Sequence, residues 1–467
     1  MEHQKRNSFS GSVGFVLAAA GSAVGLGNIW RFPYLAAKDG GGLFLAVYLI
    51  LALTFGFTLL VTEVAIGRKT KQSPLTAYAK LRPKWGFLGV VASLVPVIIL
   101  PYYCVIGGWV IRYFLAYLTG EGMRAAQDGY FTDFITSQFS PIVMLAIFLA
   151  VVSVIIILGV NKGIENFSKV LMPILILLVL GIAVFSLTIS HTDADGVTRT
   201  GLQGMRIYVV PDLSGITLQG FFTVLLDAMG QLFFSLSVAM GIMVTYGSYV
   251  KDDANLVRSI NQIEIFDTLV AFLAGVMIIP AVFTFMGREG MEASGPSLMF
   301  VSLPRVFSAM GGIGNVIGCL FFAMVLFAAL TSAISVMEAV VSSLMDKLHW
   351  SRLKASLVEM AVALAAGIVV CLGYNIWYFE LELPNGATAQ ILDVMDYLSN
   401  NLFMPLVAIG TCVLIGWLLK PQAVIDEVEK TGDKFRRRGL YVVMVKFIAP
   451  VLLVILFLKS VGVLTVI

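Results

Sequence analysis

Small residues interrupt an apolar segment near the N-terminus, where Gly21, Ala23, Gly25 and Gly27 alternate with other residues and Asn28 follows. Each glycine weakens a helix by about 1 kcal/mol relative to alanine. An unwound backbone at membrane depth is tolerated only where it lines a cavity or is buried in protein. Its free carbonyl oxygens suit a cation, and its free amide groups suit a carboxylate. We therefore interpret this segment as a binding site, although glycines can also serve helix packing alone.

A second interruption of the same kind occurs at 230–241, where Gly230 and Gly241 flank a stretch that contains Ser235 and Ser237. It lies in the sixth apolar segment, five segments after the first interruption. Breaks at matching positions of two halves of a chain are typical of inverted-repeat transporters whose site lies near the bilayer midplane. The two halves show no direct sequence identity, so the repeat is inferred from the positions of the breaks.

Oxygen-bearing groups near the two breaks suit a sodium ion, which requires several hard oxygen ligands. They are the side chains of Asn28, Ser235, Ser237, Thr331 and Ser332 and the backbone carbonyl groups between Gly21 and Val24. A hydroxyl group in a membrane helix also often bonds to the preceding turn or to a neighbouring helix, so each hydroxyl has a structural alternative. Ionisable residues inside apolar segments are costly to bury and are functional by default. They are Glu63, Asp227, Asp267, Glu338 and Asp396.

The elements that position these residues are predicted to be membrane-spanning helices. The chain has 467 residues, of which 59% are hydrophobic and 13% charged. Apolar stretches of about 20 residues, the length that spans a bilayer, recur throughout. We expect eleven spanning segments, at 12–37, 41–67, 87–119, 141–160, 165–189, 217–250, 258–286, 314–346, 355–374, 389–419 and 440–462. The expected fold class is therefore an all-α polytopic membrane protein, and its expected partner is the lipid bilayer and not a nucleic acid.

The distribution of positive charge predicts how these segments are oriented across the membrane. Lys and Arg cluster in loops on the side of the N-terminus, which puts the N-terminus in the cytosol of a cell-membrane protein and, after an odd number of spans, the C-terminus outside. We expect a cytosolic tail at 1–9, a first repeat at 10–190, an outer loop at 191–216, a second inverted repeat at 217–419, and a cytosolic loop with the eleventh segment at 420–467. The mixed charges of 420–439 predict a solvated linker. The loop at 287–313 is expected to contain short capping or re-entrant helices.

Four motifs together form a specific signature. They are Gly21-x-Ala23-x-Gly25-x-Gly27-Asn28-x-x-Arg31-Phe32-Pro33, Asp39-Gly40-Gly41-Gly42, Glu63-x-x-x-Gly67-Arg68 and Gln231-x-Phe233-Phe234-Ser235-Leu236-Ser237. With them the chain resembles the neurotransmitter:sodium symporter family over nearly its whole length, and it is most similar to the shorter bacterial amino-acid transporters of that family. The resemblance implies a fold of five plus five helices in inverted repeats, with helices 1 and 6 broken, and sodium-driven uptake of a small solute.

The resemblance also implies two sodium sites. The first would use the carbonyl group of Ala23 and the side chains of Asn28, Ser235 and Asp267, and the substrate carboxylate would complete it. The second would use the carbonyl groups of Gly21, Val24 and Ala328 and the hydroxyl groups of Thr331 and Ser332.

Position 267 bears on chloride. Many relatives have asparagine there, and chloride-dependent relatives add a serine one turn later, whereas this chain has Asp267 and Ala271. A fixed carboxylate near Tyr48, Gln231 and Ser235 could supply the negative charge that chloride supplies elsewhere. We therefore expect that chloride is not required. The alternative is that Asp267 is a helix-packing acid paired with a neighbour.

The substrate site implied by the resemblance is mostly apolar. It comprises the backbone around Ala23, Leu26 and Gly27 and the side chains of Ile99, Tyr103, Phe234, Ser235, Ser237, Met240, Ser332 and Val336. Relatives that transport amines have an aspartate at the position of Gly25, so Gly25 favours a substrate with its own carboxylate. Met240 is flexible enough to accommodate aliphatic or aromatic side chains. A neutral hydrophobic L-amino acid is favoured, and a small amino acid, an osmolyte or an amine is the alternative.

Two pairs of charged residues resemble the gates of the family. Arg31 and Asp396 would close the outer side above Tyr103 and Phe234, and Arg6 and Asp346 would close the cytosolic side. Phe9 stands where the family usually has tryptophan.

These features predict sodium-coupled symport by alternating access. A sensor that binds an amino acid without transporting it would use the same site. An enzyme is not expected, because no nucleophile and base pair, metal motif or cofactor loop is evident, and His3, His191 and His349 lie outside the predicted spans. The sequence leaves the oligomeric state open.

Overall fold

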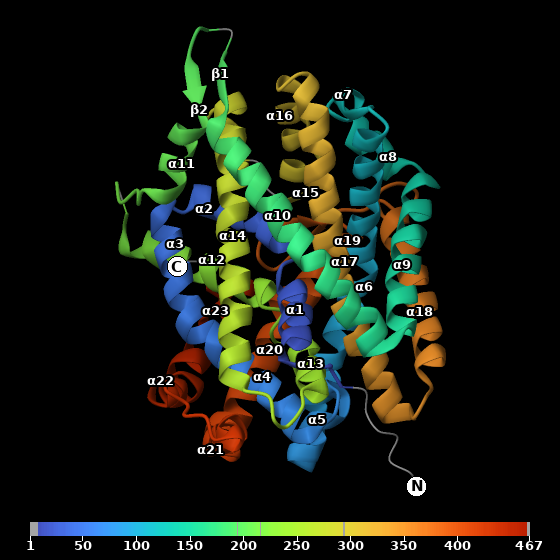
Figure 1. Ribbon diagram of the computed structural model, residues 1–467, viewed down its shortest axis with the longest axis vertical. Helices are drawn as coiled ribbons and strands as arrows, with labels where there is room; N and C mark the ends of the chain where they lie inside the picture. The colour runs from blue at the N-terminus through green and yellow to red at the C-terminus, as the bar shows by residue number, and fades with distance from the viewer. Residues whose placement is uncertain (1–7, 194, 215, 293–294, 465–467) are drawn as a thin grey trace.

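Helices form nearly the whole of this computed structural model, which describes residues 8–193, 195–214, 216–292 and 295–464 (Figure 1). The named strands in these ranges form two short antiparallel hairpins. β1 (Ser190–Thr192) pairs with β2 (Thr198–Thr200), and β3 (Leu381–Glu382) pairs with β4 (Thr388–Ala389). The prediction of an all-α protein is confirmed.

Nine helices within the described ranges are long and apolar enough to cross a membrane, and a bent pair of helices makes a tenth span if it is counted as one. Each span consists of one helix or of successive helical pieces. Their α-helical parts are α3 (Gly42–Leu51) with α4 (Phe57–Thr70), α6 (Gly86–Leu118), α9 (Ser140–Ile157), α10 (Asn166–Thr188), α14 (Leu256–Met286), α17 (Gly312–Leu348), α18 (Arg352–Leu372), α19 (Ile391–Asp396) with α20 (Met404–Val413), and α22 (Arg438–Val443) with α23 (Ala449–Ser460). The predicted segment 217–250 is not among them and divides into two helices, Leu218–Ser235 and Ile242–Tyr249. The count of eleven is therefore not confirmed.

Short helices connect the spans. They are α5 (Pro74–Leu81), α7 (Gly122–Ala125), α8 (Tyr130–Thr136), α11 (Gly201–Val209), α15 (Gly295–Ser297), α16 (Leu303–Ala309) and α21 (Gln422–Val428). Four π-helical stretches each join two α-helices directly, at Ala52–Gly56, Leu298–Ser302, Tyr397–Phe403 and Met444–Ile448. Three others lie at one end of a helix, at Gly27–Arg31, Val160–Glu165 and Leu414–Leu418. Helices α15 and α16 lie in the loop at 287–313, where short helices were expected.

The first broken helix consists of α1 (Ser12–Ala23) and α2 (Phe32–Lys38), whose span bends by 52°. Val24 leaves the helical conformation with a ψ of 84°. The amide of Gly25 then bonds to the nearby carbonyl group of Ala23 at 3.0 Å, and not to a carbonyl group four residues back. The break lies where the run of small residues predicted it.

The second broken helix consists of α12 (Leu218–Ser235) and α13 (Ile242–Tyr249). Between them, Ser237, Ala239 and Gly241 have φ angles of 53°, 63° and 75°, in the left-handed region that L side chains rarely adopt. Glu63 of α4 accepts a hydrogen bond from the amide of Ala239 at 2.6 Å. This carboxylate therefore satisfies a donor that the break leaves without a helical partner.

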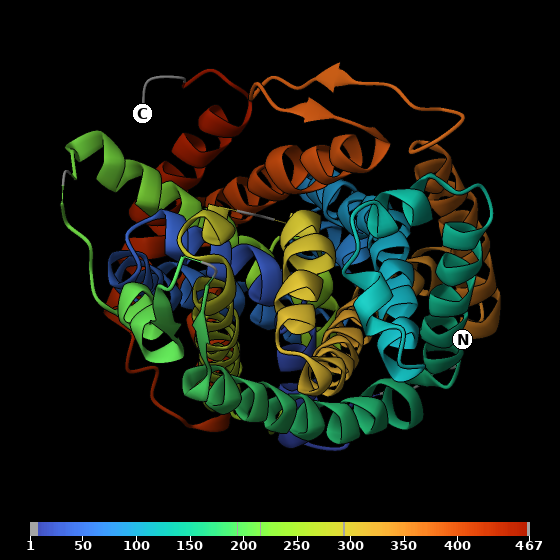
Figure 2. The same ribbon diagram turned by 90° about the horizontal axis from the view of Figure 1, so that it is seen from above.

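The broken helices lie inside the bundle, and α9, α10, α18 and α23 run around its outside (Figure 2). Close contact between backbones holds the interior together. A Cβ atom on Gly67 of α4 would lie 2.0 Å from the carbonyl oxygen of Val244 in α13, and one on Gly247 would lie 2.4 Å from the carbonyl oxygen of Val64. Small residues of this kind let membrane helices approach closely.

The segment 420–439 is not the solvated linker that its charges predicted. Helix α21 within it buries Val424, Ile425 and Val428. The buried guanidinium of Arg68 in α4 bonds to the carboxylate of Glu427 at 2.7 Å. A pattern of mixed charges does not reveal that one of them pairs with a residue far away in the sequence, and this is why the prediction was wrong.

Candidate functional site

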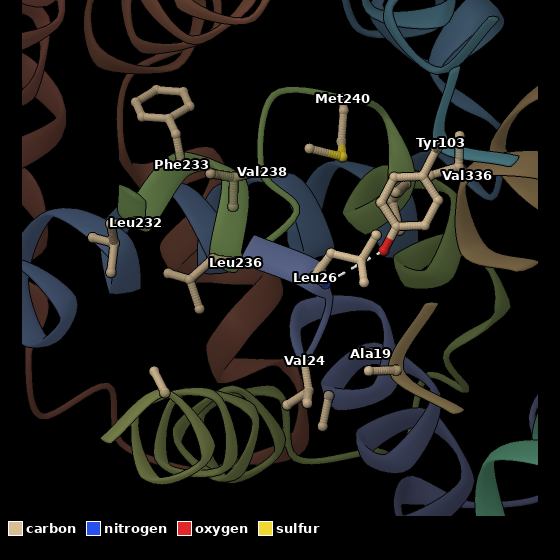
Figure 3. Packing of buried hydrophobic residues seen from close by; sticks show 14 of the residues in the cluster. Ala19, Val24, Leu26, Tyr103, Leu232, Phe233, Leu236, Val238, Met240 and Val336 are labelled. Atoms are coloured by element: carbon tan, nitrogen blue, oxygen red, sulfur yellow. Dashed lines mark hydrogen bonds between the residues drawn. The ribbon is translucent and has the colours of Figure 1, made fainter. Parts of the chain in front are cut away.

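The two helix breaks face each other across a small closed cavity. Its walls come from the first break, α6, the second break and α17, and they are formed by Ser22, Ala23, Gly25, Gly27, Asn28, Ile99, Tyr103, Phe234, Ser237, Met240, Ile242, Ser332 and Val336. The structure thus brings together all the predicted substrate residues except Leu26 and Ser235. Leu26 lies beside the cavity, where its amide donates to the hydroxyl of Tyr103 at 3.5 Å (Figure 3).

Glycine is required where the first break meets these side chains. A Cβ atom on Gly27 would lie 2.5 Å from the ring of Phe234, and one on Gly25 would lie 2.7 Å from Oγ of Ser332. The cavity volume is about 20 Å³, which is room for one water molecule. An amino acid therefore enters only if a wall moves. Phe234 lines both this cavity and a larger one beyond it, so its ring separates the two.

The carboxylate of Asp267 on α14 lies at the centre of a buried polar cluster. Its Oδ1 accepts hydrogen bonds from Nδ2 of Asn28 at 2.8 Å and from Oγ of Ser235 at 2.6 Å, and its Oδ2 accepts one from the hydroxyl of Tyr48 at 3.2 Å. All four residues are at most 1% exposed. Three of the predicted ligands of the first sodium ion are thus in direct contact with one another. The cluster combines one negative charge with neutral oxygens, which suits a monovalent cation.

The predicted second sodium site lies between α1 and α17. The hydroxyl of Ser332 donates to the carbonyl oxygen of Ser22 at 3.1 Å and lies 3.5 Å from that of Gly21. The hydroxyl of Thr331 instead donates within its own helix, to Phe327 at 3.0 Å and to Ala328 at 3.1 Å. Ser332 therefore reaches across to the first break, whereas Thr331 makes the bond to the preceding turn that was its structural alternative.

The outer gate residues do not form an ion pair. Asp396 accepts hydrogen bonds from the hydroxyl of Tyr102 at 3.1 Å and from Nδ2 of Asn400 at 2.5 Å. Arg31 has no ion-pair partner within 4.0 Å among the described residues. It lines a cavity of about 600 Å³, the outer vestibule, whose floor includes Phe234. The side of the molecule predicted to be extracellular is thus open down to Phe234.

The side predicted to be cytosolic is closed by aromatic rings. Phe9 is 1% exposed, its amide donates to the carbonyl of Tyr249 at 3.2 Å, and its ring centroid lies 5.7 Å from that of Tyr246. Asp346 accepts a hydrogen bond from the amide of Ser73 at 2.6 Å. Its predicted partner Arg6 lies outside the described residues.

Sequence reasoning missed the partners of Glu338. This fully buried carboxylate of α17 accepts hydrogen bonds from Arg352 of α18 at 2.7 and 2.9 Å and from the hydroxyl of Tyr249 at 2.6 Å. Glu338 stood out as an acid inside a predicted span, but Arg352 looked like an ordinary loop cation. The network connects the C-terminal end of α13 to α17 and α18, beside Phe9.

The chain is similar to known proteins in both sequence and structure. A model of the sodium:neurotransmitter symporter family matches residues 6–126 and 132–466. An uncharacterized sodium-dependent transporter of Bacillus subtilis is 33% identical over 100% of both chains. A sodium- and chloride-dependent GABA transporter of Rattus norvegicus is 26% identical over 91% of this chain and 75% of its own. The crystal structure of MhsT in complex with L-phenylalanine is similar with a TM-score of 0.84, at 34% identity, over 97% of this chain and 100% of the other.

Proposed function

The chain belongs to the sodium:neurotransmitter symporter family, and from this premise we propose that it imports a neutral hydrophobic L-amino acid together with sodium, by alternating access, without requiring chloride. The observation that carries the proposal is the closed cavity between the helix breaks. Apolar side chains and the unwound backbone line it together, and Asn28 in its wall bonds to the buried carboxylate of Asp267.

The apolar residues that line the cavity favour a substrate with a hydrophobic side chain. Ile99, Val336, Met240 and the ring of Phe234 line the cavity, and Met240 adapts to ligands of different shape because its side chain is unbranched. The binding of L-phenylalanine by MhsT supports this class of substrate. GABA and taurine transporters among the relatives support the alternative, a small polar solute, but the apolar walls of this cavity count against it.

The absence of a side chain at Gly25 favours a substrate that carries its own carboxylate. An aspartate there would have to displace Ser332 and Tyr103, whose oxygens lie 2.7 and 3.3 Å from the position of a Cβ atom. Without that carboxylate, the negative charge nearest the first break is that of Asp267, which is already bonded to Asn28 and Ser235, so a carboxylate that meets the free amide groups has to come from the substrate. The free amide groups of the break suit an anionic group.

Sodium and substrate would then stabilise each other's binding. The substrate carboxylate would complete the coordination that Asn28, Ser235 and Asp267 begin, and the sodium ion would neutralise two carboxylates that otherwise repel each other. Such a coupling is reciprocal, because each ligand raises the affinity of the other by the same factor.

Chloride independence follows from Asp267 in this proposal. Its carboxylate is already fixed next to Tyr48 and Ser235, so a second anion there would be repelled. Ala271, one turn further along α14, is fully buried and offers no hydroxyl to an anion.

Alternating access is supported by the asymmetry of the two sides. The outer vestibule reaches Phe234, while Phe9 and the Glu338 network close the cytosolic side. Swinging Phe234 outward would admit the amino acid, and the approach of Arg31 to Asp396 would then close the vestibule before the cytosolic side opens.

The test is uptake by the purified full chain in lipid vesicles with an inward sodium gradient. Radiolabelled Leu, Ile, Val, Phe, Tyr and Trp are compared with glycine, GABA and taurine, each in chloride and in gluconate buffer. Sodium-dependent accumulation of the first group in both buffers is the expected result. Binding without accumulation would identify a sensor, loss of uptake in gluconate would contradict chloride independence, and uptake of only the second group would contradict the substrate class.

A further inference from the structure

Two lysines from different helices bind the same carboxylate at the mouth of the outer vestibule. Oδ2 of Asp227 on α12 lies 2.9 Å from Nζ of Lys38, and Oδ1 lies 3.5 Å from Nζ of Lys459. Lys38 ends α2, the outer half of the first broken helix, so its bond joins the outer halves of the two broken helices. Lys459 belongs to α23, which is not part of either. Of these two ion pairs, the second therefore connects the broken helices to another element of the bundle.

The end of α23 that carries Lys459 is held in place by three contacts. The hydroxyl of Tyr397 donates to the carbonyl oxygen of Ser460 at 3.1 Å. Helix α23 packs against α20. A Cβ atom on Gly462, whose φ is +74°, would lie 2.0 Å from the carbonyl oxygen of Pro384 in the turn between β3 and β4. Figure 2 shows this hairpin beside the C-terminal end of the chain. Lys459 thus belongs to a part of the vestibule lining that these contacts hold in place.

The position of Asp227 on α12 couples it to the floor of the vestibule. Asp227 and Phe234 are seven residues apart in one continuous helix, which places them on the same face about two turns from each other. Both line the vestibule. A tilt of α12 that moves Phe234 therefore also moves Asp227 relative to Lys459.

We propose that Lys459 is a positioning residue of the outer gate, which holds α12 in the open arrangement through its ion pair with Asp227. The proposal rests on the alternating-access function above. In the structure the Lys459–Asp227 pair is formed while Arg31 and Asp396 are apart. Closure moves α12 and its Phe234 ring, so the pair loosens as the gate closes. Loss of the pair shifts the population of molecules toward the closed arrangement.

The test measures how fast an uncharged thiol reagent labels Asn401→Cys, a position that lines the vestibule. Labelling of the purified full chain is followed in sodium and in potassium buffer, with no amino acid added, and the background of the parent with its four native cysteines is subtracted. We expect Lys459→Met to slow labelling about two- to fivefold, the range for a partly exposed ion pair. Lys459→Arg should restore the parent rate. Asp195→Cys, on an exposed loop, reports the reactivity of the reagent and should not change.

A second variant disturbs the contacts at the end of α23 and leaves the charges of Lys459 and Asp227 in place. Gly462→Ala forces the end of α23 away from Pro384 and should slow labelling in the same direction. Gly432→Ala is the matched control, because Gly432 also has a positive φ but nothing lies near its Cβ position. An unchanged rate in Lys459→Met, or Lys459→Arg behaving like Lys459→Met, overturns the proposal. Because no amino acid is present, a wrong substrate class would fail in the uptake assay and leave this result unaffected.

Discussion

At the scale of single residues, the carboxylate of Asp267 is the central charged group of the candidate site. Its carboxylate is fully buried, and its recorded hydrogen bonds come from neutral groups of Asn28, Ser235 and Tyr48. In the described part of the chain no Lys, Arg or His lies within ion-pair distance of it. A buried charge without an opposite charge is costly. Binding a cation beside Asp267 therefore removes a cost that the folded protein otherwise bears.

Substitution of Gly25 tests whether the first break must lie against the cavity wall. Gly25→Ala places a methyl group 2.7 Å from Oγ of Ser332. Overpacking of this kind costs about 1–3 kcal/mol, so we expect sodium-dependent binding of radiolabelled L-phenylalanine to weaken by about tenfold or more. Gly312→Ala, where the Cβ position is open, is the control and should bind normally. Equal affinity in the two variants would show that the glycine run serves helix packing alone.

The raised pKa of Asp39, which lies between α2 and α3, predicts that the stability of the folded protein depends on pH. Burial, together with the nearby carboxylate of Asp227, raises the pKa of Asp39 to about 6. The folded state therefore binds this proton more tightly than the unfolded state, so the stability that protonation contributes is fully present below the ordinary pKa of 3.8 and is lost as the pH rises from there to about 6. We expect Asp39→Asn to raise the apparent unfolding temperature at pH 8 and to have a much smaller effect at pH 4.

Asp193 serves as a control, because its pKa shifts in the opposite direction to that of Asp39. The hydrogen bond from the amide of Val197 and the ion pair with Arg199 lower the pKa of Asp193, so its ionised form is favoured in the folded state. Asp193→Asn should therefore lower the unfolding temperature at pH 8. A gain for Asp39→Asn that is as large at pH 4 as at pH 8 would contradict the assignment.

At the scale of elements, the sequence predicted where the helices break but not how the second break is held. Runs of small residues are visible locally, and both breaks occur within them. The left-handed Ser237 and Ala239 carry ordinary side chains, and Glu63 satisfies the amide of Ala239 from another helix. A long-range contact of this kind leaves no local pattern. Glu63 could only be recognised as an acid inside an apolar segment.

The Glu338 network predicts a large effect from a single substitution. Arg352→Met leaves Glu338 buried without its cation, and breaking a buried ion pair costs about 3–5 kcal/mol. We expect a marked fall in the unfolding temperature of the purified protein. Arg305→Met, which removes an exposed pair with Asp128, should cost about 1 kcal/mol or less.

Removing both charges separates the ion pair from general damage to packing. The double variant Arg352→Met/Glu338→Leu should recover part of the loss, since no uncompensated charge remains. If Arg352→Met unfolds no earlier than Arg305→Met, the network does not secure the cytosolic side.

At the scale of the whole molecule, composition and hydropathy predicted the class of fold, and the motifs predicted the family. The eleven spans were not confirmed, because neither half of the second broken helix is among the helices of the described residues that are long and apolar enough to cross a membrane. The segment 420–439 was predicted wrongly because the partner of Glu427 is Arg68, at the other end of the sequence. Features set by local composition could be read from the sequence, whereas pairings between distant residues could not.

The whole molecule is open on one side and closed on the other. The vestibule of about 600 Å³ ends at Phe234, and the closed cavity begins on the far side of its ring. The cavity meets the Asp267 cluster at Asn28, which lines the cavity and bonds to Asp267. Substrate and sodium would therefore occupy one continuous site, and this is the central claim for the molecule.

The most direct test of that claim is the apparent sodium affinity of the purified protein, measured by titration with and without saturating L-phenylalanine, together with the affinity for L-phenylalanine at low and high sodium. A shared site predicts that each ligand raises the affinity of the other by the same factor, and that Asp267→Asn weakens sodium binding and reduces this factor. Asp433→Asn, far from the site in the sequence and on the loop after α21, should leave both affinities unchanged. A sodium affinity that does not respond to the amino acid would contradict the shared site.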